Sequence, residues 1–170
     1  MTGANNIPAE ADYFLKPAYI FVPSKPTLIS TVLGTCVAVS LFDKKRRVGG
    51  MSHFKYPRTS DPKQATAHYG NVAIPTLINM MLEAGSKIRH LEAQIFGGAY
   101  NPEYSQEDVG EENVELARMV LKKKGVKVVS EDVGGEKGRK LVFHSEKNET
   151  AVMKVERLRP SDWYPYEGER

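Results

Sequence analysis

Hydrophobic and polar residues recur along the chain in short blocks, and the spacing within each block predicts its secondary structure. Residues 72–84 carry apolar side chains at helical spacing, with Pro75 in the first turn and Gly85 at the end, which predicts a helix. Residues 113–124 show the same spacing and stop at Gly125. The pattern therefore predicts two helices.

The other apolar blocks are short and rich in β-branched residues, which is typical of strands. Residues 27–42 form the longest block and are interrupted at Gly34, so they predict two strands, or a strand and a helix, joined by a sharp bend. Residues 48–56 alternate apolar and polar side chains after a double glycine and predict a strand that ends before Pro57. Shorter predicted strands span residues 18–22, 91–96, 126–129, 140–144 and 150–155.

Many strands with only two helices indicate an α+β fold, because two helices are too few for a regular alternation of strands and helices. A chain of 170 residues suits one compact domain. We therefore expect residues 1–170 to form a single-domain layered sandwich of mixed β-sheet with two main helices. Residues 1–17 and 160–170 are expected to be peripheral tails.

Composition narrows the class of protein. Hydrophobic residues make up 41% of the chain and charged residues 26%, the balance of a soluble globular protein. A net charge of +3 is too mild to indicate nucleic-acid binding, and the basic runs at residues 44–47 and 122–124 are expected to be an exposed turn and an exposed helix end. The chain has no signal-peptide pattern and no apolar run near the roughly 18 residues that cross a bilayer. We expect a cytoplasmic protein with no nucleic-acid partner and no membrane insertion.

Cys36 is the only cysteine, which excludes an internal disulfide and any metal site with several cysteines. A lone cysteine in an apolar stretch is usually a small core residue. However, Gly34 and Thr35 precede it in a polar turn, where backbone N–H groups can face a developing anion. If the residues that follow form a helix, its dipole would also lower the thiol pKa. Cys36 is thus a candidate nucleophile.

His53 is the candidate base for this thiol. It follows Cys36 by 17 positions on a separate predicted strand, and one hairpin turn would bring the two strands together. A histidine on a strand is, by itself, more often structural. The other histidines lack the spacing of a zinc-binding helix: His68, His90 and His144. We expect no metal site and no cofactor.

Two glycine pairs, at residues 97–98 and 134–135, resemble phosphate-binding loops only superficially. Neither matches the spacing of a P-loop or of a dinucleotide-binding loop. We expect both pairs to form tight turns.

The segment at residues 30–39 (STVLGTCVAV), followed by GGMSH at residues 49–53, resembles the signature of the CheD family of chemoreceptor glutamine deamidases. Further blocks follow in the family's order, and the resemblance extends from about residue 19 to residue 155: YGNVAI at 69–74, IFGGA at 95–99, VGEEN at 109–113 and DVGGEKGRKLVF at 132–143. The combination of the LGTC and GGMSH elements is much more specific than either alone.

The resemblance implies a cysteine hydrolase of the deamidase type, a protein-glutamine glutaminase that needs no cofactor. Its substrate would be glutamine side chains on the cytoplasmic helices of chemotaxis receptors, converted to glutamate with release of ammonia. In the family a Cys–His–Thr triad does the chemistry, and Cys36 and His53 match its first two members. The family threonine lies six residues before the cysteine, where this chain has Ser30. We prefer Ser30 as the third member and keep Thr31 as the alternative, since neighbours on a strand face opposite sides.

Backbone N–H groups near Gly34 and Thr35 are expected to hold the oxyanion, and the polar residues 59–68 to border an open active-site groove. The resemblance also implies a second partner, a CheC-type phosphatase of the response regulator. Many members have an arginine just before the position of Asn113, where this chain has Glu112, and we expect this change to alter a partner contact.

Two other functions stay open. The departure at Ser30 allows a binding protein with little or no catalysis that regulates such a phosphatase. A different thiol hydrolase, such as a receptor methylesterase, is the third interpretation.

Overall fold

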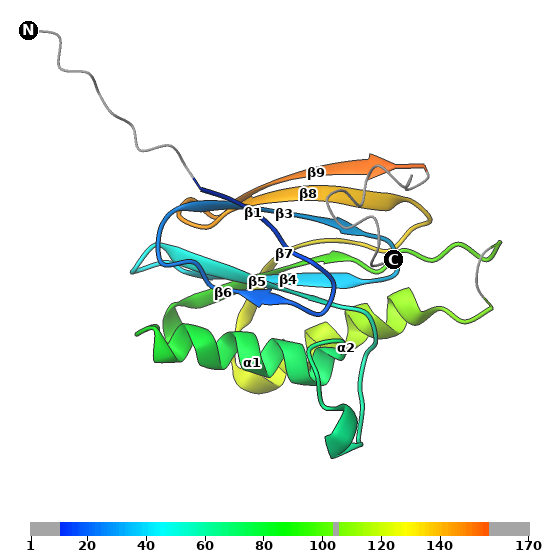
Figure 1. Cartoon of the computed structure of the whole chain (residues 1–170), viewed down its shortest axis with the longest axis horizontal. Helices are drawn as coiled ribbons and strands as arrows, with labels where there is room; N and C mark the ends of the chain where they lie inside the picture. The colour runs from blue at the N-terminus through cyan, green and yellow to red at the C-terminus, as the bar shows by residue number, and fades with distance from the viewer. Residues whose placement is uncertain (1–10, 104–105, 157–170) are drawn as a thin grey trace, which may run out of the picture.

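The computed structural model describes residues 11–103 and 106–156, which form three layers. Figure 1 shows two β-sheets stacked face to face, with two helices on the free side of one sheet. The outer sheet has the strand order β1-β3-β8-β9 and the central sheet the order β2-β5-β4-β6-β7. Both are mixed, because β1 pairs with β3 and β6 with β7 in parallel while the other pairs are antiparallel. The predicted α+β layered sandwich is confirmed.

The bounds of the elements are as follows. The outer sheet consists of β1 (Ala11–Phe14), β3 (Thr27–Leu33), β8 (Gly138–His144) and β9 (Glu149–Val155). The central sheet consists of β2 (Ile20–Phe21), β4 (Val37–Asp43), β5 (Val48–Phe54), β6 (Leu91–Gly97) and β7 (Lys127–Val133). The helices are α1 (Gly70–Glu83) and α2 (Val109–Lys124), with short 3-10 turns at η1 (Pro62–Gln64) and η2 (Ile88–His90).

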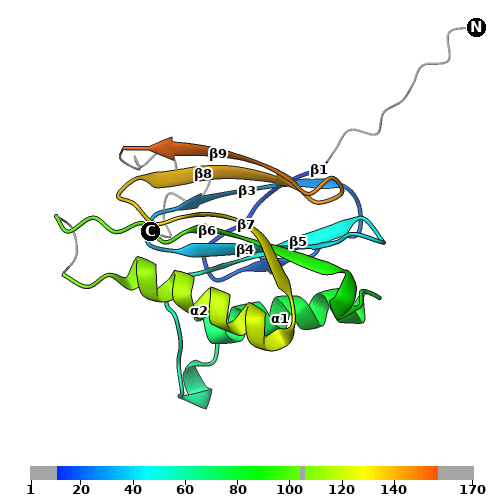
Figure 2. The same ribbon diagram turned by 180° about the vertical axis from the view of Figure 1, so that it is seen from behind.

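Each interface between layers holds an apolar core. One cluster lies between the central sheet and the helices, which Figure 2 shows side by side beneath it, and includes Val39, Leu77 and Ile95. The other fills the space between the sheets and includes Ile29, Leu33, Ala38 and Met51. Strand β4 lies at the centre of both interfaces, and all seven of its residues are buried. This explains why its sequence is mostly apolar and does not alternate, with Ser40 and Asp43 as its polar residues.

The helix ends follow the expected signals, with one correction. Helix α2 begins at Val109, four residues earlier than residue 113, because its first turn is polar and carries no apolar spacing. The Asp108 side chain caps this end by accepting a hydrogen bond from the Glu111 N–H at 2.9 Å. Gly125 ends the helix with a φ of 77°.

The segment around the bend at Gly34 forms two strands, β3 and β4, so the alternative with a helix after Cys36 is wrong. The predicted tail of residues 1–17 also needs correction, since residues 11–14 form β1 and pair with β3. β1 is stabilised by pairing with β3, which lies further along the chain, so the sequence of residues 11–14 alone gives little indication of a strand. Residues 1–10 and the expected tail 160–170 lie outside the described residues.

Candidate active site

Cys36 lies where the chain crosses from the outer sheet to the central sheet. β3 ends at Leu33 and β4 begins at Val37, so Gly34, Thr35 and Cys36 form the whole crossover. Thr35 is exposed and Cys36 is half-buried. Cys36 therefore lies at an edge between the two sheets, with part of the residue exposed to solvent and part packed between the sheets.

The turn that follows β6 holds this crossover from one side. The Ala99 N–H donates to the Gly34 carbonyl at 3.0 Å, and the Gly98 N–H donates to the Cys36 carbonyl at 2.9 Å. Gly97 has a φ of 100°, and a Cβ atom there would collide with the Cys36 carbonyl oxygen. This close approach requires a glycine. The predicted turn at residues 97–98 is confirmed and lies directly against the nucleophile.

Asn113 on α2 holds the crossover from a second side. Its side-chain N–H groups donate to the Thr35 carbonyl at 3.0 Å and to the Lys55 carbonyl at 2.9 Å. The carbonyls of three consecutive residues, Gly34, Thr35 and Cys36, are thus all hydrogen-bonded. The backbone around the thiol is fixed before any substrate arrives.

His53 lies on β5 and is fully buried. It pairs with Ala38 of the neighbouring strand β4, and directly paired residues face the same side of a sheet. Cys36 precedes Ala38 by two residues, and both belong to the cluster between the sheets. The imidazole and the thiol therefore face the same side of the central sheet, and the predicted hairpin of β4 and β5 is present.

Thr31 on β3 holds the imidazole from the other sheet. Its hydroxyl Oγ1 lies 2.8 Å from His53 Nδ1 and 2.8 Å from the Leu15 carbonyl oxygen. A carbonyl only accepts, so the single hydroxyl proton goes to Leu15 and Oγ1 accepts from His53. Nδ1 therefore carries the proton of the neutral ring, and Nε2 has the free lone pair. Nε2 is buried and has no partner among the described residues.

This geometry corrects the preference for Ser30. Thr31 shares the inward face of β3 with the buried residues Ile29 and Leu33, whereas Ser30 faces outward and pairs with Val142, which is 39% exposed. The two neighbours do point to opposite faces, as expected. The hydroxyl on the side of His53 is that of Thr31, the alternative kept open above.

Burial sets the protonation states of the pair. It raises the pKa of the Cys36 thiol to about 11, against the smaller opposing effects of the Lys55 ammonium and of the Cys36 N–H. Burial also lowers the pKa of His53 to about 3, with a further lowering by Lys55 and a partial offset from the Leu15 carbonyl. At neutral pH the pair is thus a thiol and a neutral imidazole. The helix-dipole effect considered for the thiol does not arise.

The remaining histidines lie elsewhere. His68 contacts Thr66 in the loop before α1, and His144 Nδ1 accepts from the N–H groups of Glu146 and Lys147 in the β8–β9 turn. Within residues 11–103 and 106–156, no group of three or more His, Cys, Asp or Glu side chains is arranged to hold a metal ion.

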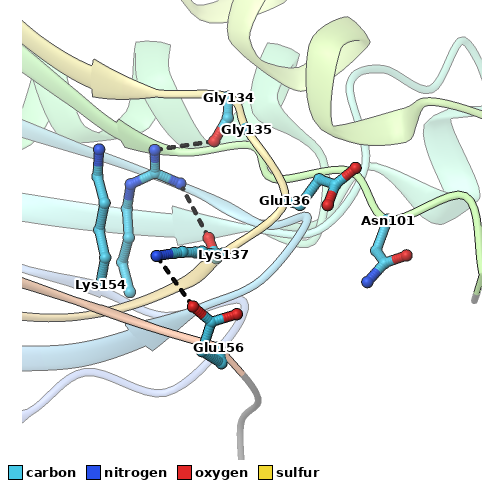
Figure 3. A pocket seen from close by; sticks show the side chains of 8 residues that line it. Asn101, Gly134, Gly135, Glu136, Lys137, Lys154 and Glu156 are labelled. Carbon is cyan, nitrogen blue, oxygen red and sulfur yellow. Dashed lines mark hydrogen bonds and ion pairs between the residues drawn. The ribbon is translucent and has the colours of Figure 1, made fainter.

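A separate cleft of about 360 Å³ lies beside the second glycine pair (Figure 3). Its charged side chains form ion pairs: Lys137 with Glu156 at 3.0 Å, and Arg139 with Asp132 at 3.0 Å. It is lined by Asn101, Gly134, Gly135, Glu136, Lys137, Arg139, Lys154 and Glu156. Neither Cys36 nor His53 lines it.

Sequence reasoning missed two of the side chains around the pair. The VGEEN motif includes Asn113 without indicating its role, and Lys55 belongs to none of the motifs. The signal for Lys55 was its position two residues after His53, on the same side of the strand. Asn113 gave no local signal, because its two carbonyl partners lie 78 and 58 residues away in the chain.

The fold and this site define a class: an α+β sandwich with a thiol directly before one strand of a sheet, an imidazole on the neighbouring strand, and a threonine from the other sheet behind the imidazole. The family model described as "CheD chemotactic sensory transduction" matches residues 55–154. The chain belongs to the CheD family.

Individual relatives extend the similarity beyond that match. "Probable chemoreceptor glutamine deamidase CheD" of Sulfurimonas denitrificans is 35% identical over 147 residues, which cover 85% of this chain and 94% of that protein. "Probable chemoreceptor glutamine deamidase CheD 1" of Anaeromyxobacter dehalogenans is 43% identical over 136 residues, 79% of each chain. A match over 85% of 170 residues leaves only about 25 outside it, so it includes Cys36 and His53.

No helix in the described ranges is long and apolar enough to cross a membrane.

Proposed function

We propose that this protein deamidates glutamine side chains on the cytoplasmic helices of chemotaxis receptors, with Cys36 as nucleophile, His53 as base and Thr31 as the residue that orients the base. The observation that carries the proposal is the hydrogen bond between Thr31 and His53 Nδ1, which leaves Nε2 as the proton acceptor. The names of the relatives supply the substrate class.

The first half of the reaction forms a thioester. Because the resting thiol is protonated, His53 Nε2 removes its proton as Cys36 Sγ attacks the amide carbon. The carbonyl electrons move to oxygen, and backbone N–H groups of the crossover stabilise this oxyanion; one such donor typically contributes about 3–4 kcal/mol. Nε2 then returns the proton to the amide nitrogen, the C–N bond breaks and ammonia leaves.

The second half hydrolyses the thioester. His53, neutral again, takes a proton from water as the water oxygen attacks the same carbon. The C–S bond breaks, Cys36 regains its proton, and the product is a glutamate side chain. Throughout, Thr31 accepts from Nδ1 and holds the ring in one tautomer, the part that an aspartate plays in a serine protease triad.

The product differs from the substrate by one negative charge. On a receptor helix, a new carboxylate repels like charges three or four residues away by about 0.2–0.5 kcal/mol per pair. Several such sites can shift the balance between receptor states, which accounts for a role in chemotactic adaptation. We further propose that the protein works in the cytoplasm and as one domain.

Ammonia release from purified receptor fragments tests the proposal. Wild type should convert specific glutamines, and Cys36→Ala and His53→Gln should not. Thr31→Val, which removes the hydroxyl and keeps the shape, should lower kcat about tenfold or more, whereas Ser30→Ala should change it less than twofold. Equal activity of wild type and Cys36→Ala would refute the proposal. Methanol release in place of ammonia would identify a methylesterase.

A second function involves the CheC-type phosphatase. Glu112 is exposed and lines a cleft of about 530 Å³ with Pro57, Arg58 and Met119, and Met119 is 47% exposed. A solvent-facing charge beside an apolar side chain fits a partner contact better than a catalytic one. Glu112→Arg should therefore change phosphatase affinity and leave deamidation unchanged. Tight phosphatase binding by a wild type that releases no ammonia would favour the purely regulatory function.

A further inference from the structure

Asn113 joins the nucleophile crossover to the strand that carries His53, and it does so from inside the protein. Its side chain is fully buried on α2. The two N–H groups of Nδ2 contact the carbonyls of Thr35, the residue before Cys36, and of Lys55, two residues after His53. One amide thus links the backbone segments of both reacting side chains.

The orientation of this amide is determined by its partners. Both are carbonyl oxygens, which only accept, so the NH₂ group must face them and Oδ1 must point away. Oδ1 is buried and has no partner among the described residues. Burying an oxygen without a hydrogen-bond partner costs free energy. The favourable contribution of Asn113 must therefore come from the two backbone carbonyls that its N–H groups bind.

The first of these bonds sets the direction of the Cys36 N–H. In a planar trans peptide the carbonyl and the following N–H point in opposite directions. Since the Thr35 carbonyl points toward α2, the Cys36 N–H points away from it. This N–H donates to no other described residue and lies by the sulfur of its own side chain. It is therefore a donor that can bind an oxyanion formed beside that sulfur.

Helix α2 is fixed firmly enough to act as the support. Gly110, one turn before Asn113, packs so closely on the backbone of Gly98 and Ala99 that a Cβ atom would collide with their carbonyl oxygens. The same turn, at Gly98 and Ala99, donates to the carbonyls on either side of Thr35. The amide of Asn113 therefore completes a rigid set of three anchored carbonyls.

We propose that Asn113 is a positioning residue for the deamidation reaction. By holding the Thr35 carbonyl it directs the Cys36 N–H to the oxyanion, and by holding the Lys55 carbonyl it sets the separation of Cys36 and His53. This inference rests on the proposed function of Cys36 as the nucleophile.

Asn113→Leu tests it, because leucine has a similar shape and no N–H groups. We expect kcat for deamidation of receptor fragments to fall between tenfold and a hundredfold, with KM changed less than twofold, since the lost interaction acts on the transition state. Alkylation of Cys36 by iodoacetamide forms no oxyanion and should slow by less than threefold. A purely structural role would not separate these two rates.

Gln94→Leu is the matched control. Gln94 on β6 is also a nearly buried amide, and its Nε2 donates to Asn148 Oδ1 at 2.7 Å, away from the crossover. We expect a similar loss in Tm for both variants but an unchanged kcat for Gln94→Leu. Asn113→Ser, which is too short to reach both carbonyls but leaves room for water, replaces Asn113→Leu if the latter does not fold.

Three results would overturn the role of Asn113. They are an unchanged kcat in a folded Asn113 variant, an equal loss of kcat in Gln94→Leu, and an iodoacetamide rate that falls as far as kcat. A wild type that releases no ammonia would instead remove the proposed function itself. The two failures are therefore distinguishable in one set of measurements.

Discussion

The two glycine pairs end neighbouring strands of the central sheet, β6 and β7, and they touch: the Gly134 N–H donates to the Gly97 carbonyl at 2.9 Å. All four glycines have positive φ angles, 100° and 67° in the first pair and 79° and 70° in the second. Their surroundings differ. A Cβ atom at Gly97 or Gly98 would collide with neighbouring backbone or side chains, whereas nothing lies within 4 Å of one at Gly134 or Gly135.

A buried polar side chain that donates to backbone carbonyls lies near each turn. Asn113 serves the crossover beside the first pair, and Arg139 donates to the carbonyls of Gly134 and Lys137 beside the second. The difference is that backbone packs on backbone only at the first turn, the one that supports Cys36. Close packing is thus concentrated at the turn beside Cys36. Substitutions at the first turn should therefore affect both stability and deamidation, and those at the second turn stability alone.

Gly98→Ala should have the largest effect. Its added Cβ would lie 2.8 Å from the Gly110 carbonyl oxygen and even closer to the Val114 side chain. The positive φ costs about 1–2 kcal/mol for an alanine, and overpacking adds about 1–3 kcal/mol. We expect the free energy of unfolding, measured by urea denaturation, to fall by about 3 kcal/mol or more, with loss of deamidation. A loss no larger than that of Gly135→Ala would show that the first turn is packed no more tightly than the second.

Arg139→Met should have the next largest effect, on stability alone. The guanidinium is 2% exposed and donates to Asp132 as well as to the two carbonyls. In this variant Asp132 would not become an unpaired buried charge, because it is one-third exposed and also forms an ion pair with Lys154 at 3.6 Å. We expect the free energy of unfolding to fall by about 2 kcal/mol, less than the roughly 3–5 kcal/mol lost when a fully buried ion pair is broken. Deamidation by the folded variant should be within twofold of wild type.

The exposed ion pair of Arg118 with Glu131, at 2.7 Å, provides the control for Arg139. Arg118→Met should cost less than about 1 kcal/mol, because solvent screens the pair. If Arg139→Met lowered kcat more than twofold while remaining folded, the second turn would also belong to the active site.

Gly135→Ala isolates the conformational cost without a collision. Nothing lies within 4 Å of the added Cβ, and φ is 70°. Urea denaturation should show a loss of about 1 kcal/mol, and Gly135→Asn should lose less because asparagine tolerates this conformation better. Equal losses for alanine and asparagine would mean that the turn does not keep its positive φ in solution.

Much of the fold could be predicted from the sequence, because its signals are local. The period of residues 72–84 reflects the face that α1 buries. The alternation of residues 48–56 correctly predicted a strand, although β5 is buried on both faces. β1 was missed because its partner is β3, 16 residues further along the chain, and its own sequence reads as a polar lead-in. β7 runs to Val133, four residues beyond the prediction, because this half-exposed strand is polar at its centre.

The active-site residues follow the same rule: those with a local sequence signal could be predicted, and those that act through distant contacts could not. Cys36 and His53 could be predicted as a pair because each lies in a short local motif and the combination of the two motifs is specific. The choice between Ser30 and Thr31 depended on which face of β3 meets the other sheet, and apolar residues on both sides of the pair left that face undetermined. Asn113 and the Leu15 carbonyl act through contacts between distant segments, which no local pattern encodes.

Lys55→Met should have the smallest effect. It removes a positive charge near the first turn and should slow alkylation of Cys36 only slightly. The Lys55 ammonium lowers the pKa of the Cys36 thiol, which burial raises to about 11. Removing the ammonium raises that pKa further, so at a fixed pH below it the thiolate fraction and the iodoacetamide rate fall. A shift of about half a pH unit corresponds to about threefold in rate. Lys154→Met, at the second turn, removes the same charge and should leave the rate unchanged. If both substitutions slowed alkylation equally, the effect would come from net charge and not from the position of Lys55 beside Cys36.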